Sequence, residues 1–300
     1  MSIKRKTRKL FRAIGSVFKS TIYSKPKVMT ATESIKYIIE NKVSLSRFGD
    51  GEISLMCGVS LQFQKADLLL QKRLIEVSQS NNENVFVAIP DFFISKKLMM
   101  ARSADFAVRF WRRGHLPFCR GTWYKYFGGR TFGDALMTRF YIDHNDKSHV
   151  PAYIELCKKL WDNRDIVFIE GAKSRLGVGN DLFDNSSSVR RIICPSEDAF
   201  DEYERILQSV KSNIEKEALI ILALGPTATV MAYDLGNLGY QALDLGHIDI
   251  EYEWFLMGAK HKVPVPNKII REAEGSNTEF DAIKDETYHQ EIIATIGKEQ

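Results

Sequence analysis

The sequence predicts an α/β protein with a Rossmann-like, mainly parallel open sheet that carries helices on both faces. Two observations support this fold class. Apolar segments with strand periodicity alternate with amphipathic segments of about 10–18 residues, a pattern typical of βαβ units. In addition, Ala218 to Leu224 form an almost purely apolar run, as expected for a strand buried on both faces in the middle of a parallel sheet.

The first half of the chain contains two predicted strands between helical segments. Residues 43–48 alternate with a period of two up to a Gly-Asp-Gly sequence, and residues 85–90 form an apolar strand that ends at a proline. The segments around these strands are amphipathic, with apolar residues at helical spacing. They predict helices at 32–40, 66–79 and 94–113.

The second half continues the alternation without an internal repeat. Strands are predicted at 166–169, 191–194, 218–224 and 241–245. Helices are predicted at 149–162, 197–215 and 227–238. We therefore expect one sheet domain over residues 30–262, preceded by a basic amphipathic segment (1–29) and followed by a polar C-terminal extension (263–300).

The composition excludes several protein classes. Of the 300 residues, 44% are hydrophobic and 27% are charged, which is ordinary for a soluble globular chain. No apolar run is long enough to span a membrane as a helix. The four cysteines are scattered and form no CxxC pair, which argues against a zinc knuckle or a redox motif and fits the reducing cytoplasm.

The positive charge belongs to the N-terminal segment. Residues 1–27 carry nine basic side chains and no acidic one, whereas the rest of the chain has 33 basic and 38 acidic residues. A nucleic-acid-binding domain would spread positive charge over its folded body. We therefore expect no nucleic-acid partner.

The same segment has the pattern of a helix that lies on a membrane surface. Its apolar residues recur every three or four positions between lysines and arginines: Leu10, Phe11, Ile14, Val17, Phe18 and Ile22. Each basic residue near an anionic leaflet contributes about 1 kcal/mol to binding. Residues 1–28 could thus hold a cytoplasmic protein on the inner face of the membrane; the alternative is a solvated basic tail.

Ligands of open parallel sheets bind beyond the carboxyl ends of the strands, so polar residues in these loops are candidate site residues. The first such loop, residues 47–52, contains Arg47, Gly49, Asp50 and Glu52. Two carboxylates separated by one residue can share a hard cation such as Mg²⁺ or Mn²⁺. The alternative is a turn in which the aspartate caps a helix.

Two further loops have features of phosphate sites. Residues 170–181 combine three glycines with Lys173 and Arg175 and end in Asn180 and Asp181; glycine amides and cations can cradle an anion, although a flexible surface loop has the same composition. The other loop contains Gly225, Pro226 and Thr227. It precedes a predicted helix whose N-terminal amides could bind phosphate or could simply be capped.

The fourth loop, residues 246–254, is rich in acid/base groups. His247, Asp249 and Glu251 lie within it together with Glu253. If the segment is extended, these four side chains lie on one side of it. They could supply a general base, a further metal ligand or acceptors for sugar hydroxyls; the alternative is a set of unrelated surface carboxylates.

Five separated motifs give the chain a specific resemblance to a known family. Over residues 30–258 it resembles the bacterial glycosyltransferases of the GT-D fold, formerly a domain of unknown function. The motifs are RFGDGE (47–52), RFYIDHNDKS (139–148), SRLGVGNDLFDN (174–185), RRIICPSEDAFDEYERIL (190–207) and LGPTATVMAYDLGNLGYQALDLGHIDIEYEW (224–254). They occur in the family's order. On this resemblance, Arg139 is expected to bind substrate. One departure is Phe140, because the family usually has proline after the arginine that corresponds to Arg139.

The resemblance implies a GT-D-type domain, a nucleotide-sugar donor (UDP-glucose in characterised members) and a metal motif in which Asp50 and Glu52 hold Mn²⁺ or Mg²⁺ against the donor diphosphate. Arg47, Arg175 and the amides after Gly225 are then expected to stabilise the leaving group. The acceptor, a glycan, glycoprotein or lipid-linked glycan, would be deprotonated by one of three residues, in the order Asp249, Glu251, His247. The family implies inversion.

Two rival functions use the same residues. A nucleotide-sugar hydrolase or phosphotransferase could act at this edge of the sheet. A non-catalytic module that binds a nucleotide sugar at the membrane is a second alternative, although the intact Asp50, Glu52 and 247–253 carboxylates argue against it.

Overall fold

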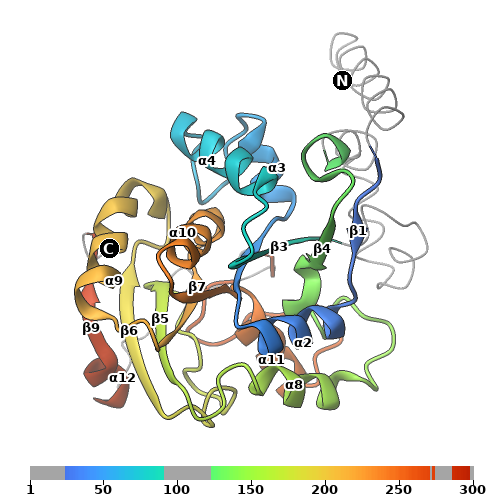
Figure 1. Ribbon diagram of the computed structural model, residues 1–300. Coiled ribbons are helices and arrows are strands. Elements are labelled where there is room, and N and C mark those ends of the chain that lie inside the picture. Colours follow the sequence, from blue (N-terminus) through green and yellow to red (C-terminus); the bar gives the residue numbers. More distant parts are fainter. Residues whose placement is uncertain (1–23, 91–122, 271, 274–285, 298–300) are drawn as a thin grey trace, which may run out of the picture.

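The computed structural model describes residues 24–90, 123–270, 272–273 and 286–297. Within these ranges the chain forms a nine-stranded sheet in the order β1-β4-β3-β2-β8-β7-β5-β6-β9, and each pair of neighbouring strands is parallel. Helices flank the sheet (Figure 1). This is the α/β class with a parallel open sheet that the sequence predicts.

The strands agree with the predicted apolar segments and add three that the sequence analysis missed. The predicted ones are β2 (Ser44–Arg47), β3 (Val85–Ile89), β5 (Asp165–Gly171), β6 (Ser188–Cys194), β7 (Leu219–Ala223) and β8 (Gln241–Asp244). The additional ones are β1 (Lys27–Val28), β4 (Thr131–Asp134) and β9 (Ile292–Thr295). The apolar β7 lies inside the sheet between β8 and β5, as expected from its side chains.

The helices divide between the two faces of the sheet. On one face, α3 (Asp50–Met56), α4 (Leu68–Gln79), α9 (Tyr203–Asn213) and α10 (Pro226–Asn237) share a hydrophobic core. On the other face, α2 (Ala31–Asn41), α8 (Val150–Lys158) and α11 (Ile248–Leu256) share a second core (Figure 1). Two cores on opposite faces are the expected consequence of a parallel sheet that is buried on both sides.

Local sequence explains where these helices begin. The Thr30 hydroxyl accepts the Glu33 amide, and the Glu33 carboxylate accepts the Thr30 amide at 2.8 Å, which makes a capping box at the start of α2. Asp67 caps α4 by accepting two amide hydrogen bonds. Such caps satisfy backbone donors that have no partner within the helix.

The segment 246–254 differs from the extended conformation considered above. It forms helix α11, so side chains at alternate positions do not lie on one side. Its apolar residues and its acidic residues are both buried. The predicted helix at 94–113 lies outside the described residues.

The described residues after 262 pack against the domain rather than forming a separate polar extension. Val265 and Ile270 belong to the core on the α11 side, and β9 extends the sheet beside β6. A short helix, α12 (Glu286–Glu291), precedes β9. The expected boundary at residue 262 therefore does not separate two structural units among the described residues.

The topology places a crevice beside β2 and β8. After β2 the chain turns to α3 on one face, whereas after the neighbouring β8 it turns to α11 on the other face. Loops that diverge in this way leave an opening at the carboxyl ends of adjacent strands, where open α/β sheets bind their ligands.

Candidate active site

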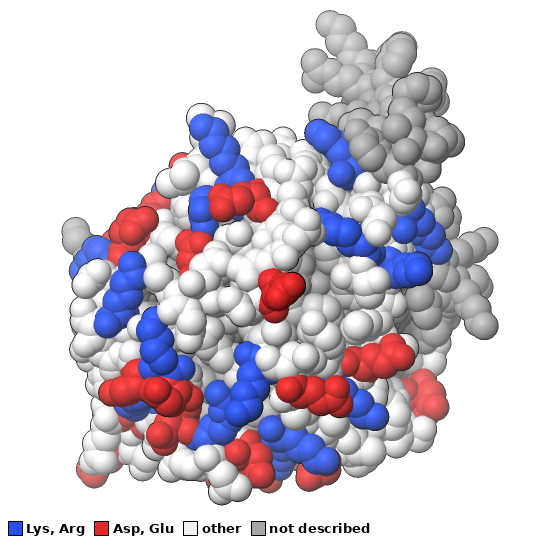
Figure 2. Space-filling view, viewed as in Figure 1, with Lys and Arg blue, Asp and Glu red and all other residues white. Residues whose placement is uncertain are grey.

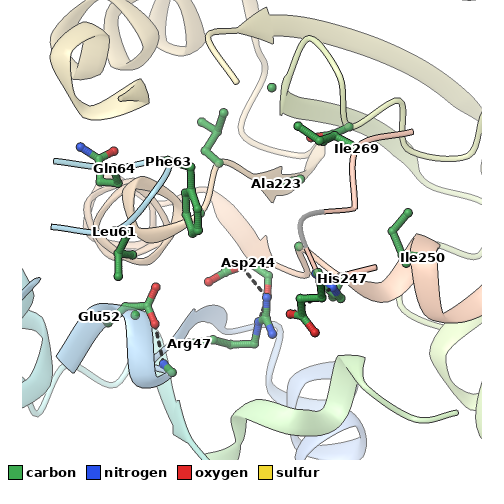
Figure 3. Close-up of a pocket in the computed structure, with 18 of the residues that line it drawn as sticks. Arg47, Glu52, Leu61, Phe63, Gln64, Ala223, Asp244, His247, Ile250 and Ile269 are labelled. Atoms are coloured by element: carbon green, nitrogen blue, oxygen red, sulfur yellow. Dashed lines mark hydrogen bonds and ion pairs between the residues drawn. The ribbon is translucent and has the colours of Figure 1, made fainter. Parts of the chain in front are cut away.

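A cavity of about 710 Å³ opens at this crevice, a volume in the range of small-molecule sites. The loops after β2, β5, β6, β7 and β8 all contribute to its lining. Figure 3 shows the Arg47–Asp244 pair between Glu52 on one side and His247 on the other, with Leu61 above Glu52 and Phe63 above the pair.

Arg47 and Asp244 join the two central strands at the base of the cavity. Arg47 Nη2 lies 2.8 Å from Asp244 Oδ1, and Nε donates to the Asp244 carbonyl. Nη1 donates to the Thr138 hydroxyl at 2.7 Å and to the Ala135 carbonyl. Burial raises the pKa of Asp244, although the guanidinium opposes this shift. Because protein groups accept from all three nitrogens, Arg47 acts here as a structural clamp as well as a wall of the cavity.

Asp50 and Glu52 both line the cavity at the start of α3. Glu52 Oε2 accepts the Gly49 amide at 2.6 Å, which caps the helix, so the capping alternative describes part of its role. Burial raises the pKa of Glu52 to about 7, with smaller contributions from the Asp244 and Asp50 charges. Burial in the cavity wall thus disfavours the ionised form of Glu52.

The donor set fits a divalent cation that also binds substrate. Within the described chain, no three His, Cys, Asp or Glu side chains converge as a complete metal site. Two carboxylates on one helical turn are nevertheless a sufficient protein contribution for Mg²⁺ or Mn²⁺, which take their other ligands from phosphate oxygens and water. A cation there would stabilise the ionised form of Glu52, which burial disfavours.

Gly225 brings the N-terminus of α10 to the cavity. Its φ of +54° is unfavourable for other residues, and a Cβ there would lie 2.9 Å from the Phe63 ring. Gly225 lines the cavity, whereas Pro226 and Thr227 begin the helix behind it. Both of these residues are buried, and Thr227 has no exposed surface. The predicted helix terminus is thus present, with Gly225 as its contact to the cavity.

The predicted phosphate loop 170–181 lines the cavity with residues other than those expected to bind phosphate. Gly171, Ser174 and Leu176 line the cavity, but Lys173, Arg175, Asn180 and Asp181 are absent from its lining. Arg175 donates to the Asn267 carbonyl at 3.2 Å. Asp181 accepts the Tyr252 hydroxyl at 2.6 Å. The cation-rich composition of this loop therefore serves contacts with neighbouring segments.

Asn180 belongs to a buried network centred on Asp249. Asp249 Oδ1 accepts from the Gly177 amide and from Asn180 Nδ2, both at 2.9 Å. Its Oδ2 lies 2.6 Å from Lys268 Nζ, which also contacts Glu253 at 2.8 Å. Asp249 is completely buried although it borders the cavity. These contacts hold α11, the 170–181 loop and the C-terminal segment together.

The other two predicted bases have different surroundings. Glu251 is not part of the cavity lining; its Oε2 accepts the amides of Tyr141 and Ile142, and burial raises its pKa to about 7. His247 does line the cavity. Burial and the Arg139 charge lower the pKa of His247 to about 3, so its imidazole is neutral at pH 7.

Sequence reasoning missed several residues of the cavity. Asp244 ends the buried strand β8, and a carboxylate there was a signal that could have been used, because such a group needs a buried partner. Lys262 and Glu272 line the cavity from the segment after α11. Neither residue lies in one of the five motifs, and Glu272 lies in the segment that was expected to be outside the domain.

The fold agrees with comparisons to known proteins. Residues 45–273 match the family described as glycosyltransferase GT-D fold. The chain is 41% identical over 276 residues to the glycosyltransferase GlyD of Streptococcus pneumoniae serotype 4 (strain ATCC BAA-334 / TIGR4), which covers 88% of this chain and 32% of that protein. It is 38% identical over 280 residues to the probable glycosyl transferase Gly of Streptococcus gordonii. This match covers 91% of this chain and 39% of that protein. The chain thus spans less than half the length of these curated relatives.

Solved structures give the same result. A structure of the domain of unknown function 1792, described as having a distinct glycosyltransferase fold, superposes with a TM-score of 0.83 at 41% identity and covers 94% of this chain and 100% of that chain. A glycosyltransferase (DUF1792) from Streptococcus sanguinis superposes with a TM-score of 0.84 at 39% identity and covers 91% of this chain and 100% of that chain. Because the family match extends over most of the sequence, the resemblance of its motifs is confirmed and this chain belongs to the family of glycosyltransferases with the GT-D fold.

Proposed function

We propose that the protein is a metal-dependent glycosyltransferase that moves a hexose from a nucleotide-diphosphate sugar, a UDP-sugar in the first instance, to an acceptor hydroxyl. One observation carries the proposal: Asp50 and Glu52 border the same cavity as the Gly225 helix terminus, in a chain that belongs to this family. A carboxylate pair and a helix N-terminus facing one cavity match the needs of a metal-bound diphosphate.

Asp50 and Glu52 would hold Mn²⁺ or Mg²⁺. When bound, such a cation supplies Lewis-acid stabilisation of the negative charge that develops on the leaving diphosphate. The amides at the start of α10 would bind phosphate oxygens beside Gly225. Leu61 and Phe63 form an apolar part of the wall (Figure 3), which suits the nucleoside end of the donor.

Deprotonation of the acceptor is assigned to the 247–249 region. His247 and Asp249 border the cavity and Glu251 does not. The neutral imidazole of His247 has a nitrogen lone pair to accept a proton, but its low pKa makes it a weak base. Asp249 shares both oxygens with protein donors. We therefore propose these two residues, and turnover of the His247→Gln and Asp249→Asn variants distinguishes them.

The acceptor would be a glycan, a glycoprotein or a lipid-linked glycan. Within the described residues, no helix has the length and apolarity required to cross a bilayer. We propose that residues 1–28 instead bind the inner face of the membrane from the cytoplasm, through the basic and apolar side chains of that segment. Equal flotation with anionic liposomes after removal of these residues would overturn this part of the proposal.

The test is a panel of nucleotide sugars assayed with Mn²⁺, with Mg²⁺ and with EDTA, scored for nucleotide release and for transfer to added acceptors. We expect metal-dependent release that falls at least about a hundredfold in Asp50→Asn and Glu52→Gln. Glutamine retains an acceptor for the Gly49 amide, so the helix cap is preserved. Glu215→Gln, a surface variant in the Arg190 ion pair, is the matched control.

Each outcome has a distinct meaning. Sugar release that no acceptor accelerates would favour the hydrolase or phosphotransferase alternative. Binding without turnover would favour a non-catalytic module. Full activity of the two variants in the presence of EDTA would remove the metal from the proposal.

A further inference from the structure

The end of the cavity opposite Phe63 contains a group of charged residues that the proposed metal site does not use. Arg139, Lys262, His247 and Glu272 all line it, and we call these four residues the Arg139 cluster. They come from the loop after η2 (Ala135–Thr138), from the start of α11 and from the segment that follows α11. Segments far apart in the sequence thus meet around one carboxylate.

The Glu272 carboxylate lies between the two cations. Arg139 donates to both of its oxygens, Nη1 to Oε2 at 3.1 Å and Nη2 to Oε1 at 2.5 Å. Lys262 Nζ donates to Oε2. His247 Nε2 lies 3.6 Å from Oε1, too far for a hydrogen bond, and this nitrogen is buried without a hydrogen-bond partner.

The remaining charges around the cluster are fixed more firmly than Glu272. Asp143 is nearly buried and lies 3.6 Å from Lys262 and 4.0 Å from Arg139. Asp244 is engaged by Arg47. By contrast, 35% of the Glu272 side chain is exposed, against 9% for Lys262 and 21% for Arg139. Glu272 is therefore the charge of this cluster that water reaches most easily.

The bidentate contact identifies the chemistry of this site. The planar fork of an arginine fits a carboxylate and a phosphate in the same way. Arg139 and Lys262 already bind one anionic group, the Glu272 carboxylate, through three direct contacts. A phosphate could replace Glu272 on the same donors and would bring equal or greater negative charge.

We propose that Arg139 and Lys262, with His247 beside them, form an oxyanion subsite for a substrate phosphate, and that Glu272 occupies this subsite until the phosphate displaces it. The inference rests on the proposed function for the identity of the substrate. The phosphate belongs either to the nucleotide donor or to a phosphorylated acceptor. Glu272 would then be a competitor for substrate rather than a ligand of it.

The experiment measures the affinity of Glu272→Gln for phosphate-bearing probes by titration calorimetry at fixed ionic strength. The probes are UDP with Mn²⁺, UMP, inorganic pyrophosphate and glucose 1-phosphate. Removing the competing charge should tighten binding of at least one probe by about five- to tenfold. Arg139→Gln should weaken binding of the same probe by a similar or larger factor.

Two matched variants separate competition from structure. Glu215→Gln removes the carboxylate of the surface pair with Arg190, and Arg205→Gln removes the arginine of the surface pair with Glu202. Both residues lie outside the cavity lining, so neither variant should change the affinity for the probes. A merely structural Glu272 would make Glu272→Gln less stable without tightening any probe. In our account the variant instead shows a larger rise in melting temperature on addition of the probe than the wild type does.

The probes also identify the source of the phosphate. Tighter binding of UDP but not of glucose 1-phosphate assigns the subsite to the donor, and the reverse assigns it to a phosphorylated acceptor. Equal or weaker binding of every probe by Glu272→Gln overturns the inference. If the wild type binds pyrophosphate but no nucleotide, the proposed donor is wrong while the subsite itself stands.

Discussion

Asp249 shows how one residue of this site can serve the fold as well as the cavity. A fully buried carboxylate is costly unless its charge is compensated, and here a buried lysine, an amide and an asparagine compensate it. Lys268 depends on the same interaction, because it is 2% exposed and has only Asp249 and Glu253 as ionic partners among the described residues.

We expect Asp249→Asn to lower the free energy of unfolding by about 3 kcal/mol, since removing one partner of a buried pair leaves the other charge undercompensated. Urea denaturation without substrate measures this effect independently of turnover. The control is Asp201→Asn, which breaks an exposed pair with Lys65 and should change stability by less than about 0.5 kcal/mol. Equal stability of the two variants would show that the network contributes little.

At the scale of single elements, α11 is the helix whose conformation the sequence did not predict. Its polar residues at positions 247, 249, 251 and 253 predict alternation, yet the helix buries both its apolar side chains and its acids. Glu251 Oε2 accepts two amides and Lys268 contacts Asp249, whereas Glu251 Oε1 is buried without a hydrogen-bond partner among the described residues. A pattern that assumes polar residues face solvent cannot detect a helix of this kind.

Arg191 of the sheet contacts the terminal helix α12, which precedes β9. Arg191 of β6 contacts Glu170 at 2.7 Å and Glu291 at 2.6 Å. Its guanidinium also lies between the rings of Phe168 and Tyr288, 4.8 and 4.7 Å from their centroids. Because Tyr288 and Glu291 belong to α12, these contacts attach that helix to the sheet.

We expect Arg191→Met to cost about 3–5 kcal/mol, because it leaves the Glu170 carboxylate buried and unpaired. Adding Glu170→Gln should recover part of this loss, since the uncompensated charge is removed. Chemical denaturation of the two variants measures the recovery. If the double variant is no more stable than the single one, the loss comes from the ring contacts and not from the buried charge.

At the scale of the whole molecule, the sequence predicted the parallel sheet because β3, β5 and β7 contain apolar runs that alternate along the chain with amphipathic helices. The short outer strands β1 and β9 were missed because two or four residues carry too little periodicity. Asp50, Glu52, Gly225 and His247 were predicted as site residues and do border the cavity. Glu272 and Lys262 were missed because only the folded chain brings them there.

The buried acids also determine how stability changes with pH. Burial raises the pKa of Glu251 to about 7 from its ordinary value near 4.5 in the unfolded chain, so the native state holds a proton that the unfolded state has lost between these pH values. The stability contributed by this group is therefore greatest below pH 4.5 and falls as the pH rises to about 7.

We expect Glu251→Gln to abolish this decline, because glutamine remains neutral and can still accept the amides of Tyr141 and Ile142. Relative to wild type, the variant should gain on the order of 3 kcal/mol between pH 4.5 and pH 8. Urea denaturation across that range measures the difference. A constant difference between the two proteins would show that Glu251 is ionised in the native state throughout.

Over the surface of the domain, acidic and basic side chains are interspersed on the face seen in Figure 2. Several form exposed pairs, such as Lys65 with Asp201 and Arg190 with Glu215. Pairs of this kind add little stability. Charge has a larger effect in the cavity, because carboxylates and cations are buried close together there.

The proposed metal-dependent donor site is tested by the binding of UDP to the ligand-free protein, measured by calorimetry with Mn²⁺ and with EDTA. We expect binding that is at least tenfold tighter with Mn²⁺ and a dependence on metal that disappears in Glu52→Gln but persists in Glu215→Gln. Equal affinity with and without metal in the wild type, or an unchanged metal dependence in Glu52→Gln, would contradict it.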